Sequence, residues 1–151
     1  YSAGMKEKEF LVATPADFTP VIEHILERVA EPRSGATIIA LRGDLGAGKT
    51  TFTQALGAHL GITEPITSPT FVVMKEYDIE HKHFDQLVHI DAYRIEDVSE
   101  AGPLHLQELF EQSRTLICLE WPEKIAEILP SDRVEVIIEI GEGEERIVTV
   151  R

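Results

Sequence analysis

The sequence contains no asparagine and only one cysteine, Cys118. A single cysteine excludes an intrachain disulfide, and the missing asparagine excludes any N-glycosylation acceptor. No run of about 18 apolar residues occurs, so we expect no membrane-spanning helix. The N-terminal residues also show no signal peptide, and we therefore expect a protein of the reducing cytoplasm.

Positive charge is scarce in this chain, which has 14 Lys and Arg against 27 Asp and Glu and a net charge of −13. Phosphate contacts supply most non-specific affinity for nucleic acids, and a strongly acidic surface repels phosphate at long range. Stable binding to RNA or DNA by this chain alone is therefore not expected. A protein partner that carries the basic surface fits the charge better.

The length and composition are those of one folded domain. The chain has 151 residues, of which 43% are hydrophobic and 27% charged. A chain of this size buries roughly 70% of the surface that its unfolded form exposes, so it needs no metal or disulfide to fold. Because no repeat or linker-like composition occurs, we predict a single domain over residues 5–151. We interpret residues 1–4, which precede Met5, as a remnant outside the domain.

Alternating apolar segments predict an α/β protein. Short apolar runs such as 36–41 and 116–119 are typical of buried parallel strands, whereas helical spacing of apolar residues marks 21–29 as helix. We therefore predict a mixed, mainly parallel central sheet flanked by helices. The expected strands are 9–13, 36–41, 70–77, 86–90, 116–119, 134–140 and 146–150, the last two forming a hairpin, and the other expected helices are 49–60, 104–110 and 121–129.

The strongest motif is a Walker A phosphate loop, GDLGAGKT, at residues 43–50. A chain of this length would contain about 0.005 such matches by accident. The motif lies between a predicted strand and a predicted helix, as a P-loop NTPase requires. Its backbone N–H groups would surround phosphate, the lysine would bridge the β- and γ-phosphates, and the threonine would bind Mg²⁺. The predicted nucleotide-binding residues are Gly43, Asp44, Leu45, Gly46, Ala47, Gly48, Lys49, Thr50 and Thr51.

The predicted nucleotide is ATP, with Mg²⁺ as cofactor. Ras-like GTPases read guanine with an N-K-x-D motif, which a chain without asparagine cannot contain. The D-x-x-G switch element is absent as well. Both absences favour ATP over GTP.

Two carboxylates follow predicted buried strands, Asp91 after residues 87–90 and Glu120 after residues 116–119. The carboxyl ends of parallel strands meet at the edge where α/β sheets bind ligands, so both should lie beside the phosphate loop. One could hold Mg²⁺ and the other orient or activate the attacking water. The alternative is a solvated acid at each strand end. We predict both as catalytic residues and, together with Thr50, as metal ligands.

Three other side chains have two interpretations each. The Thr70 hydroxyl could sense the γ-phosphate through Mg²⁺ or simply start a strand. Trp121 could cover the nucleotide or pack in the core. Arg94 could stabilise transition-state charge or form a structural ion pair. His89 is most simply a buried, hydrogen-bonded histidine, and Cys118 an inert buried thiol.

Four motifs occur in order along the chain, GDLGAGKTT at 43–51, SPTF at 68–71, HIDAYR at 89–94 and EWPE at 120–123. Their order and spacing resemble those of the TsaE (YjeE) family, bacterial ATPases of tRNA threonylcarbamoyladenosine (t6A) biosynthesis. One departure is Ala92, where the family usually has leucine. Since the position stays apolar, the chemistry should not change.

The resemblance implies a weak ATPase that works with TsaB and TsaD. Those partners transfer a threonylcarbamoyl group to adenosine 37 of tRNA, and ATP hydrolysis would reset their complex between rounds. The tRNA would be contacted only through the complex, and no membrane is involved. The implied roles are phosphate and Mg²⁺ binding by Lys49 and Thr50, hydrolytic acids at Asp91 and Glu120, a switch-like hydroxyl at Thr70, and Trp121 beside the nucleotide.

Two other functions remain open from the sequence. A small-molecule kinase shares the phosphate loop but usually needs an arginine-rich lid, and only Arg42 and Arg94 lie between Arg33 and Arg114. A nucleotide-gated binding module would keep the phosphate loop without needing two strand-end acids. Phosphate release without an acceptor separates an ATPase from both.

Overall fold

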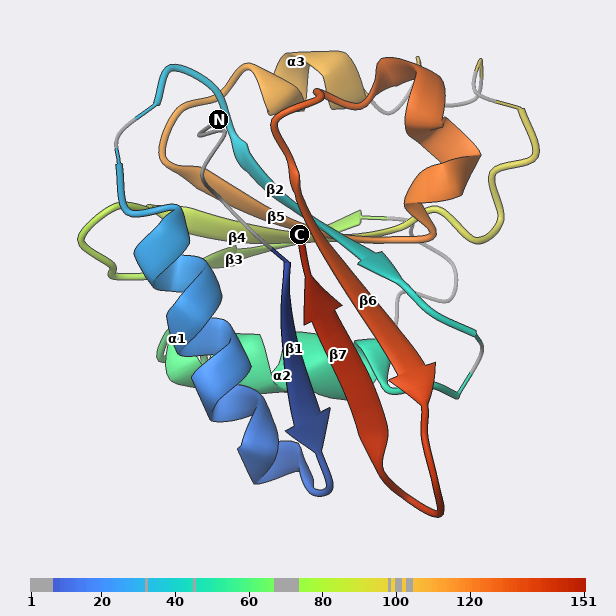
Figure 1. Cartoon of the computed structure of the whole chain (residues 1–151). Helices are drawn as coiled ribbons and strands as arrows, with labels where there is room; N and C mark the ends of the chain where they lie inside the picture. Colours follow the sequence, from blue (N-terminus) through green and yellow to red (C-terminus); the bar gives the residue numbers. More distant parts are fainter. Residues whose placement is uncertain are drawn as a thin grey trace.

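A central β-sheet with helices on both faces forms the core of the protein (Figure 1). The computed structural model describes residues 7–31, 33–44, 46–66, 74–97, 99, 102 and 105–151. Within these ranges, seven strands form one sheet in the order β1-β7-β6-β2-β5-β4-β3. The strands are β1 (Lys8–Val12), β2 (Thr37–Arg42), β3 (Met74–Asp78), β4 (Gln86–Asp91), β5 (Thr115–Glu120), β6 (Val134–Ile140) and β7 (Arg146–Val150). The helices are α1 (Phe18–Arg28), α2 (Lys49–His59) and α3 (Leu106–Phe110), and the 3₁₀ segments are η1 (Pro15–Asp17) and η3 (Pro122–Ile128).

The centre of the sheet is parallel and its edges are antiparallel. β2 pairs in parallel with β5 and β6, and β4 pairs in parallel with β5. The pairs β3–β4, β6–β7 and β1–β7 are antiparallel. β2 and β5 are buried along almost their whole length, as continuous apolar runs predict for central parallel strands. The predicted mixed sheet with parallel strands at its centre and flanking helices is confirmed, and three of its six pairings are parallel.

Each face of the sheet packs against its own set of helices. On one face Leu41 of β2 shares a core with Ile25 of α1 and Phe52 of α2. On the other face Ile38 of β2 shares a second core with Leu106 of α3. Successive residues of a strand point to opposite faces, so β2 is held from both sides. The loop that leaves β2 therefore starts from a strand that is packed on both of its faces.

The segment that follows β5 differs from its prediction. Instead of an α-helix through residue 129, η3 is a 3₁₀ segment in which Ile125 has a non-helical φ of −130°. Pro122 begins the segment without an N–H group to donate, and short 3₁₀ runs are common where the α-helical ladder is interrupted. α3 is also shorter than predicted, and the predicted strand at 70–77 is described only from Met74 onward.

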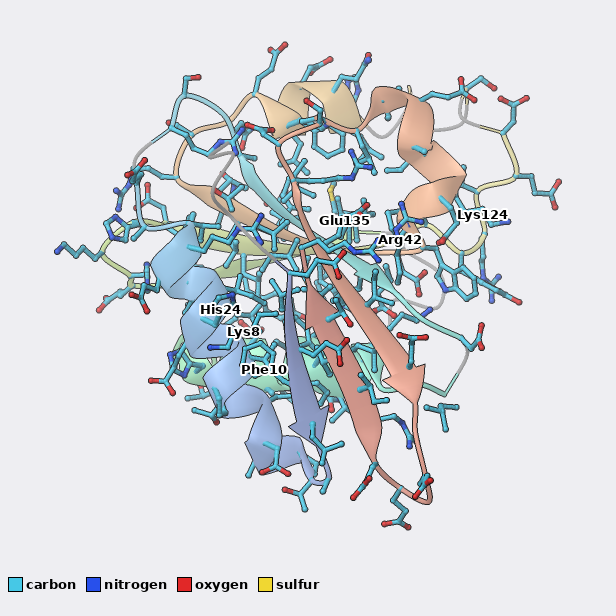
Figure 2. The ribbon with its side chains drawn as sticks, in the orientation of Figure 1. Lys8, Phe10, His24, Arg42, Lys124 and Glu135 are labelled. Atoms are coloured by element: carbon cyan, nitrogen blue, oxygen red, sulfur yellow. The ribbon has the colours of Figure 1, made fainter. Side chains whose placement is uncertain are left out.

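The edge strand β1 is fastened to α1 by ring contacts. The Phe10 ring lies 5.6 Å from the His24 ring, and the Lys8 ammonium lies 5.3 Å from the centre of the Phe10 ring. Figure 2 shows these three side chains together between β1 and α1. This packing holds β1, the edge strand farthest from β3, against α1. Among the described residues, no helix is both long and apolar enough to cross a membrane.

Candidate nucleotide site

The phosphate-loop motif lies at the carboxyl end of β2 and leads directly into α2. Gly46 and Gly48 have φ values of +82° and +115°, which side chains other than glycine rarely adopt. A Cβ on Gly43 would lie 2.6 Å from the carbonyl oxygen of Ile138 on β6, so only glycine fits there. These glycines give the loop the tight path that a phosphate-binding loop needs. Leu45, also predicted to bind nucleotide, lies outside the described residues.

Lys49, the first residue of α2, turns back into the loop. Its ammonium donates a hydrogen bond to the Gly43 carbonyl at 2.7 Å and lies 3.8 Å from the centre of the Trp121 ring. The side chain is buried, with 5% of the residue exposed. Burial lowers the pKa of Lys49, and the nearby Glu120 carboxylate opposes that shift. The positive charge of this buried ammonium, next to the glycine backbone of the loop, is suited to attract an anion such as phosphate.

Asp91 and Glu120 occupy matching positions at the ends of β4 and β5. They are partners in the parallel register, and Glu120 is in turn the partner of Leu41 on β2. The structure thus brings both predicted acids to the edge that carries the phosphate loop. Glu120 is buried at 3% exposure, whereas Asp91 is only partly buried. The alternative interpretation of Glu120 as a solvated acid is wrong, because the residue lies inside the protein.

Asp91 has a setting of its own. Its Oδ1 accepts a hydrogen bond from the Tyr93 N–H at 2.9 Å. Burial raises the pKa of Asp91, the Tyr93 hydrogen bond opposes this shift, and the Glu120 charge adds to it. The ionised form of Asp91 is therefore less favourable than that of a solvent-exposed aspartate.

His89 is the partner of Glu120 that sequence reasoning did not identify. Its Nε2 lies 2.6 Å from Glu120 Oε2, and both side chains are buried. The sequence predicted a buried, hydrogen-bonded histidine at this position, which is confirmed, but did not give its partner. The sequence does hold one signal that His89 belongs to the site, namely its spacing from Asp91 on the same strand. His89 precedes Asp91 by two residues and therefore shares its face of the sheet.

Trp121 follows Glu120 in a left-handed conformation, with φ +60° and ψ +52°. This conformation costs an L-residue roughly 1–2 kcal/mol, and such strain is concentrated at functional sites. The turn places the indole over the Lys49 ammonium and 5.2 Å from the Tyr93 ring. Trp121 thus covers the lysine of the phosphate loop, and its side chain is only partly buried.

The phosphate loop is fastened to the sheet from two sides. Arg146 of β7 donates from Nε to the Ala47 carbonyl at 3.0 Å. In α2, the Thr53 hydroxyl donates to the Lys49 carbonyl at 3.0 Å and lies 3.3 Å from the Cys118 sulfur of β5. Burial raises the pKa of the Cys118 thiol to about 12. The thiol is therefore an inert buried group, as predicted, and contributes to the packing beneath the loop.

Arg42 at the end of β2 links the loop to its neighbours. Its guanidinium binds Glu135 of β6 at 3.1 Å and Glu123 of η3 at 3.3 Å. Figure 2 shows Arg42 and Glu135 adjacent, between β2 and β6. Both pairs retain solvent contact, so their main effect is to orient β2 and η3. Arg94, by contrast, is exposed.

Of the remaining predicted site residues, three are described by the structure and one is not. Thr50 and Thr51 lie in the first turn of α2, both partly buried, and Asp44 is exposed in the loop. Thr70 lies outside the described residues.

Within the described part of the chain, no three His, Cys, Asp or Glu side chains gather to hold a metal ion by themselves. A magnesium site of the P-loop kind fits this arrangement, because it takes one hydroxyl, one or two carboxylates and the phosphate oxygens themselves.

Comparisons with known proteins point to one family. A sequence model of the family described as "Threonylcarbamoyl adenosine biosynthesis protein TsaE" matches residues 16–148. The "tRNA threonylcarbamoyladenosine biosynthesis protein TsaE" of Bacillus subtilis is 38% identical over 146 residues, covering 96% of this chain and 85% of the relative. The protein of that name from Streptomyces coelicolor is 38% identical over 118 residues, 78% of each chain.

A solved structure is similar to this protein in fold. The crystal structure of YdiB from Bacillus subtilis superimposes with a TM-score of 0.72 at 32% sequence identity, covering 99% of this chain and 87% of that one. The sequence match to the Bacillus subtilis TsaE protein and the fold match to YdiB each extend over almost the whole chain. The chain belongs to the TsaE family.

Proposed function

We propose that this protein binds and hydrolyses Mg-ATP in support of t6A biosynthesis. The observation that carries the proposal is the position of Lys49, which lies between the phosphate loop and Glu120, with Asp91 one strand further along. A loop that holds phosphate and two carboxylates beside its lysine are the parts that ATP hydrolysis needs. The names of the relatives supply the pathway, since they are called tRNA threonylcarbamoyladenosine biosynthesis proteins.

The phosphate groups would replace the partners that Lys49 now has. Its ammonium would exchange the Gly43 carbonyl and the Trp121 ring for phosphate oxygens, while the loop N–H groups surround the β-phosphate. The Trp121 ring would then lie beside the nucleotide. The exchange costs little, because a desolvated lysine gains a stronger partner than a carbonyl and a π-face.

Thr50, Asp91 and Glu120 are the residues that would hold Mg²⁺, directly or through its waters. The ion would neutralise charge on the β- and γ-phosphates when bound. Of the two acids, Glu120 is better suited to orient the attacking water, because His89 fixes one of its oxygens. We propose Thr70 as a hydroxyl that responds to the γ-phosphate, as the family resemblance implies.

TsaB and TsaD are the proposed partners, with tRNA engaged only through their complex. The net charge of −13 supports this division, because a strongly acidic chain is poorly suited to hold tRNA alone. Hydrolysis would reset the TsaB–TsaD complex between rounds of transfer. The acidic surface would favour a partner that presents basic residues.

The proposal is tested by phosphate release from Mg-ATP, measured with and without TsaB and TsaD and with Lys49→Ala as the blank. Slow release alone that rises with the partners, without any added acceptor, is the expected result. Release that requires a small-molecule acceptor would identify a kinase. Nucleotide binding without release in any condition would identify a binding module and overturn the hydrolytic role.

A further inference from the structure

His89 and Glu120 form a buried pair beneath the phosphate loop. Their side chains are 0% and 4% exposed, and His89 Nε2 lies 2.6 Å from Glu120 Oε2. In the parallel register His89 is the partner of Cys118, which precedes Glu120 by two residues. Because side chains alternate along a strand, His89, Asp91 and Glu120 all project from the same face of the sheet. That face is the one covered by α2, which begins at Lys49.

The surroundings of His89 Nδ1 indicate that His89 Nε2 is the hydrogen-bond donor to Glu120. His89 Nδ1 is buried and has no hydrogen-bond partner among the described residues. A proton on Nδ1 would leave a buried N–H donor unpaired, which is unfavourable. A ring that carries its proton on Nε2 instead avoids an unpaired donor. Nε2–H then donates to Glu120 Oε2 and leaves Oε1 unbound by the ring.

The pair is a poor solution for structural purposes alone. A buried carboxylate needs hydrogen-bond donors, and an apolar pair of similar volume would stabilise the core at least as well. Leu87 and Leu116, on the same two strands and the same face, show that apolar side chains fill this layer. The His89–Glu120 pair lies instead at the edge of the sheet that carries the phosphate loop.

We propose that His89 is a positioning residue for Glu120. Its Nε2–H fixes the glutamate side chain in one rotamer, so that Oε1 stays available to the attacking water beside Lys49. This rests on the proposed function of the site as an ATPase. The effect resembles that of outer-shell partners of metal ligands, whose loss typically costs about 10–100-fold in activity.

Kinetics of three variants test the positioning role. His89→Leu removes the donor and should lower the rate of phosphate release about 10–100-fold, while the calorimetric Kd for Mg-ATP stays within about threefold. His89→Gln carries an amide donor near the Nε2 position and should recover most of the rate. Leu87→Ala, on the same strand and face, is the matched control, which should lose stability but keep its rate. Equal rates for wild type and His89→Leu, or equal losses in the Leu and Gln variants, would overturn the proposal.

A spectroscopic measurement on wild-type protein tests the pair without any turnover. Proton–nitrogen correlation spectra of the ¹⁵N-labelled histidine ring should show a neutral ring protonated at Nε2, whose proton resonance moves in Glu120→Gln. A ring protonated at Nδ1, or a resonance that ignores Glu120→Gln, would overturn the proposal even if His89→Leu does not fold. Failure of the ATPase proposal is recognised separately, as wild-type phosphate release no greater than that of Lys49→Ala.

Discussion

The ends of β4 and β5 carry a carboxylate each, at partner positions in the sheet, yet in different surroundings. Glu120 is almost fully buried and held by His89, whereas Asp91 is partly exposed and bonded only to the backbone N–H of Tyr93 among the described contacts. β5 pairs directly with the strand that leads into the phosphate loop, and β4 lies one strand further out. We therefore call Glu120, the more buried and more tightly held of the two, the rigid acid, and Asp91 the adaptable acid.

This difference suggests how two acids can share one site. A carboxylate that must present an oxygen in a fixed direction benefits from a hydrogen bond on its other oxygen. A carboxylate that meets a hydrated cation needs freedom to adjust and a charge that becomes favourable when the cation arrives. The burial of Glu120 with its partner fits the first requirement, and the raised pKa of Asp91 fits the second.

The largest effect is expected from the lysine that both acids face. Lys49→Ala removes the cation that would bridge the phosphates and should lower turnover by at least about 100-fold or abolish nucleotide binding. Calorimetry with Mg-ATP and a phosphate-release assay measure the two effects. Undiminished binding and activity would contradict the assignment of the phosphate site and leave the two acids without a common function.

Replacing the rigid acid should separate chemistry from binding. Glu120→Ala should keep Mg-ATP binding but lose hydrolysis on the order of 100-fold, because the attacking water loses its orienting group. The same variant should lower the free energy of unfolding by about 1–3 kcal/mol, since it leaves a buried His89 donor unpaired. A normal rate in this variant would transfer the water-orienting role to Asp91.

Replacing the adaptable acid should have the opposite effect on stability. Because burial raises the pKa of Asp91 above its unfolded value, the folded protein binds that proton more tightly, and the ionised form costs stability. The cost is absent at pH values below the ordinary aspartate pKa and complete above the raised one. Asp91→Asn should therefore melt at a higher temperature than wild type at pH 7–8, with a free energy of unfolding that is higher by less than about 1 kcal/mol.

Thermal melts of both proteins from pH 3 to pH 8 measure this effect. The difference in melting temperature should shrink as the pH falls and vanish once Asp91 is protonated in both states. A difference that stays constant across the range, or that favours wild type at neutral pH, would contradict the unfavourable ionisation of Asp91.

The smallest expected signal comes from the indole next to the rigid acid. Trp121 is the only tryptophan of the chain, and its ring lies over the Lys49 ammonium. When phosphate draws the ammonium away, the fluorescence of the indole should change. A flat fluorescence titration, under conditions where calorimetry shows binding, would place the indole away from the nucleotide.

Much of this fold is predictable from the sequence because its signals are local. The apolar runs that became β2 and β5 are continuous, and the glycines of the phosphate loop mark positions that other residues cannot occupy. The 3₁₀ path of η3 was not predicted, since no residue pattern announces the non-helical Ile125 or the left-handed turn at Trp121.

In the candidate site, too, the residues with local sequence signals were predicted, whereas the contacts that depend on tertiary structure were not. Lys49, Asp91 and Glu120 were located from a motif and from strand ends, which the register then brings together. The pairing of His89 with Glu120 could not be predicted, because it depends on which strands are neighbours and on their register. The cover that Trp121 provides over Lys49 likewise depends on tertiary placement.

A crystal structure of Glu120→Gln with Mg-ATP would test the central claim most directly. We predict the triphosphate in the loop at 43–50, with the Lys49 ammonium moved from the Gly43 carbonyl to the β- and γ-phosphates. The γ-phosphate should then lie between Lys49 and the ends of β4 and β5. A nucleotide bound elsewhere, or a Lys49 ammonium that stays on the Gly43 carbonyl, would contradict this assignment.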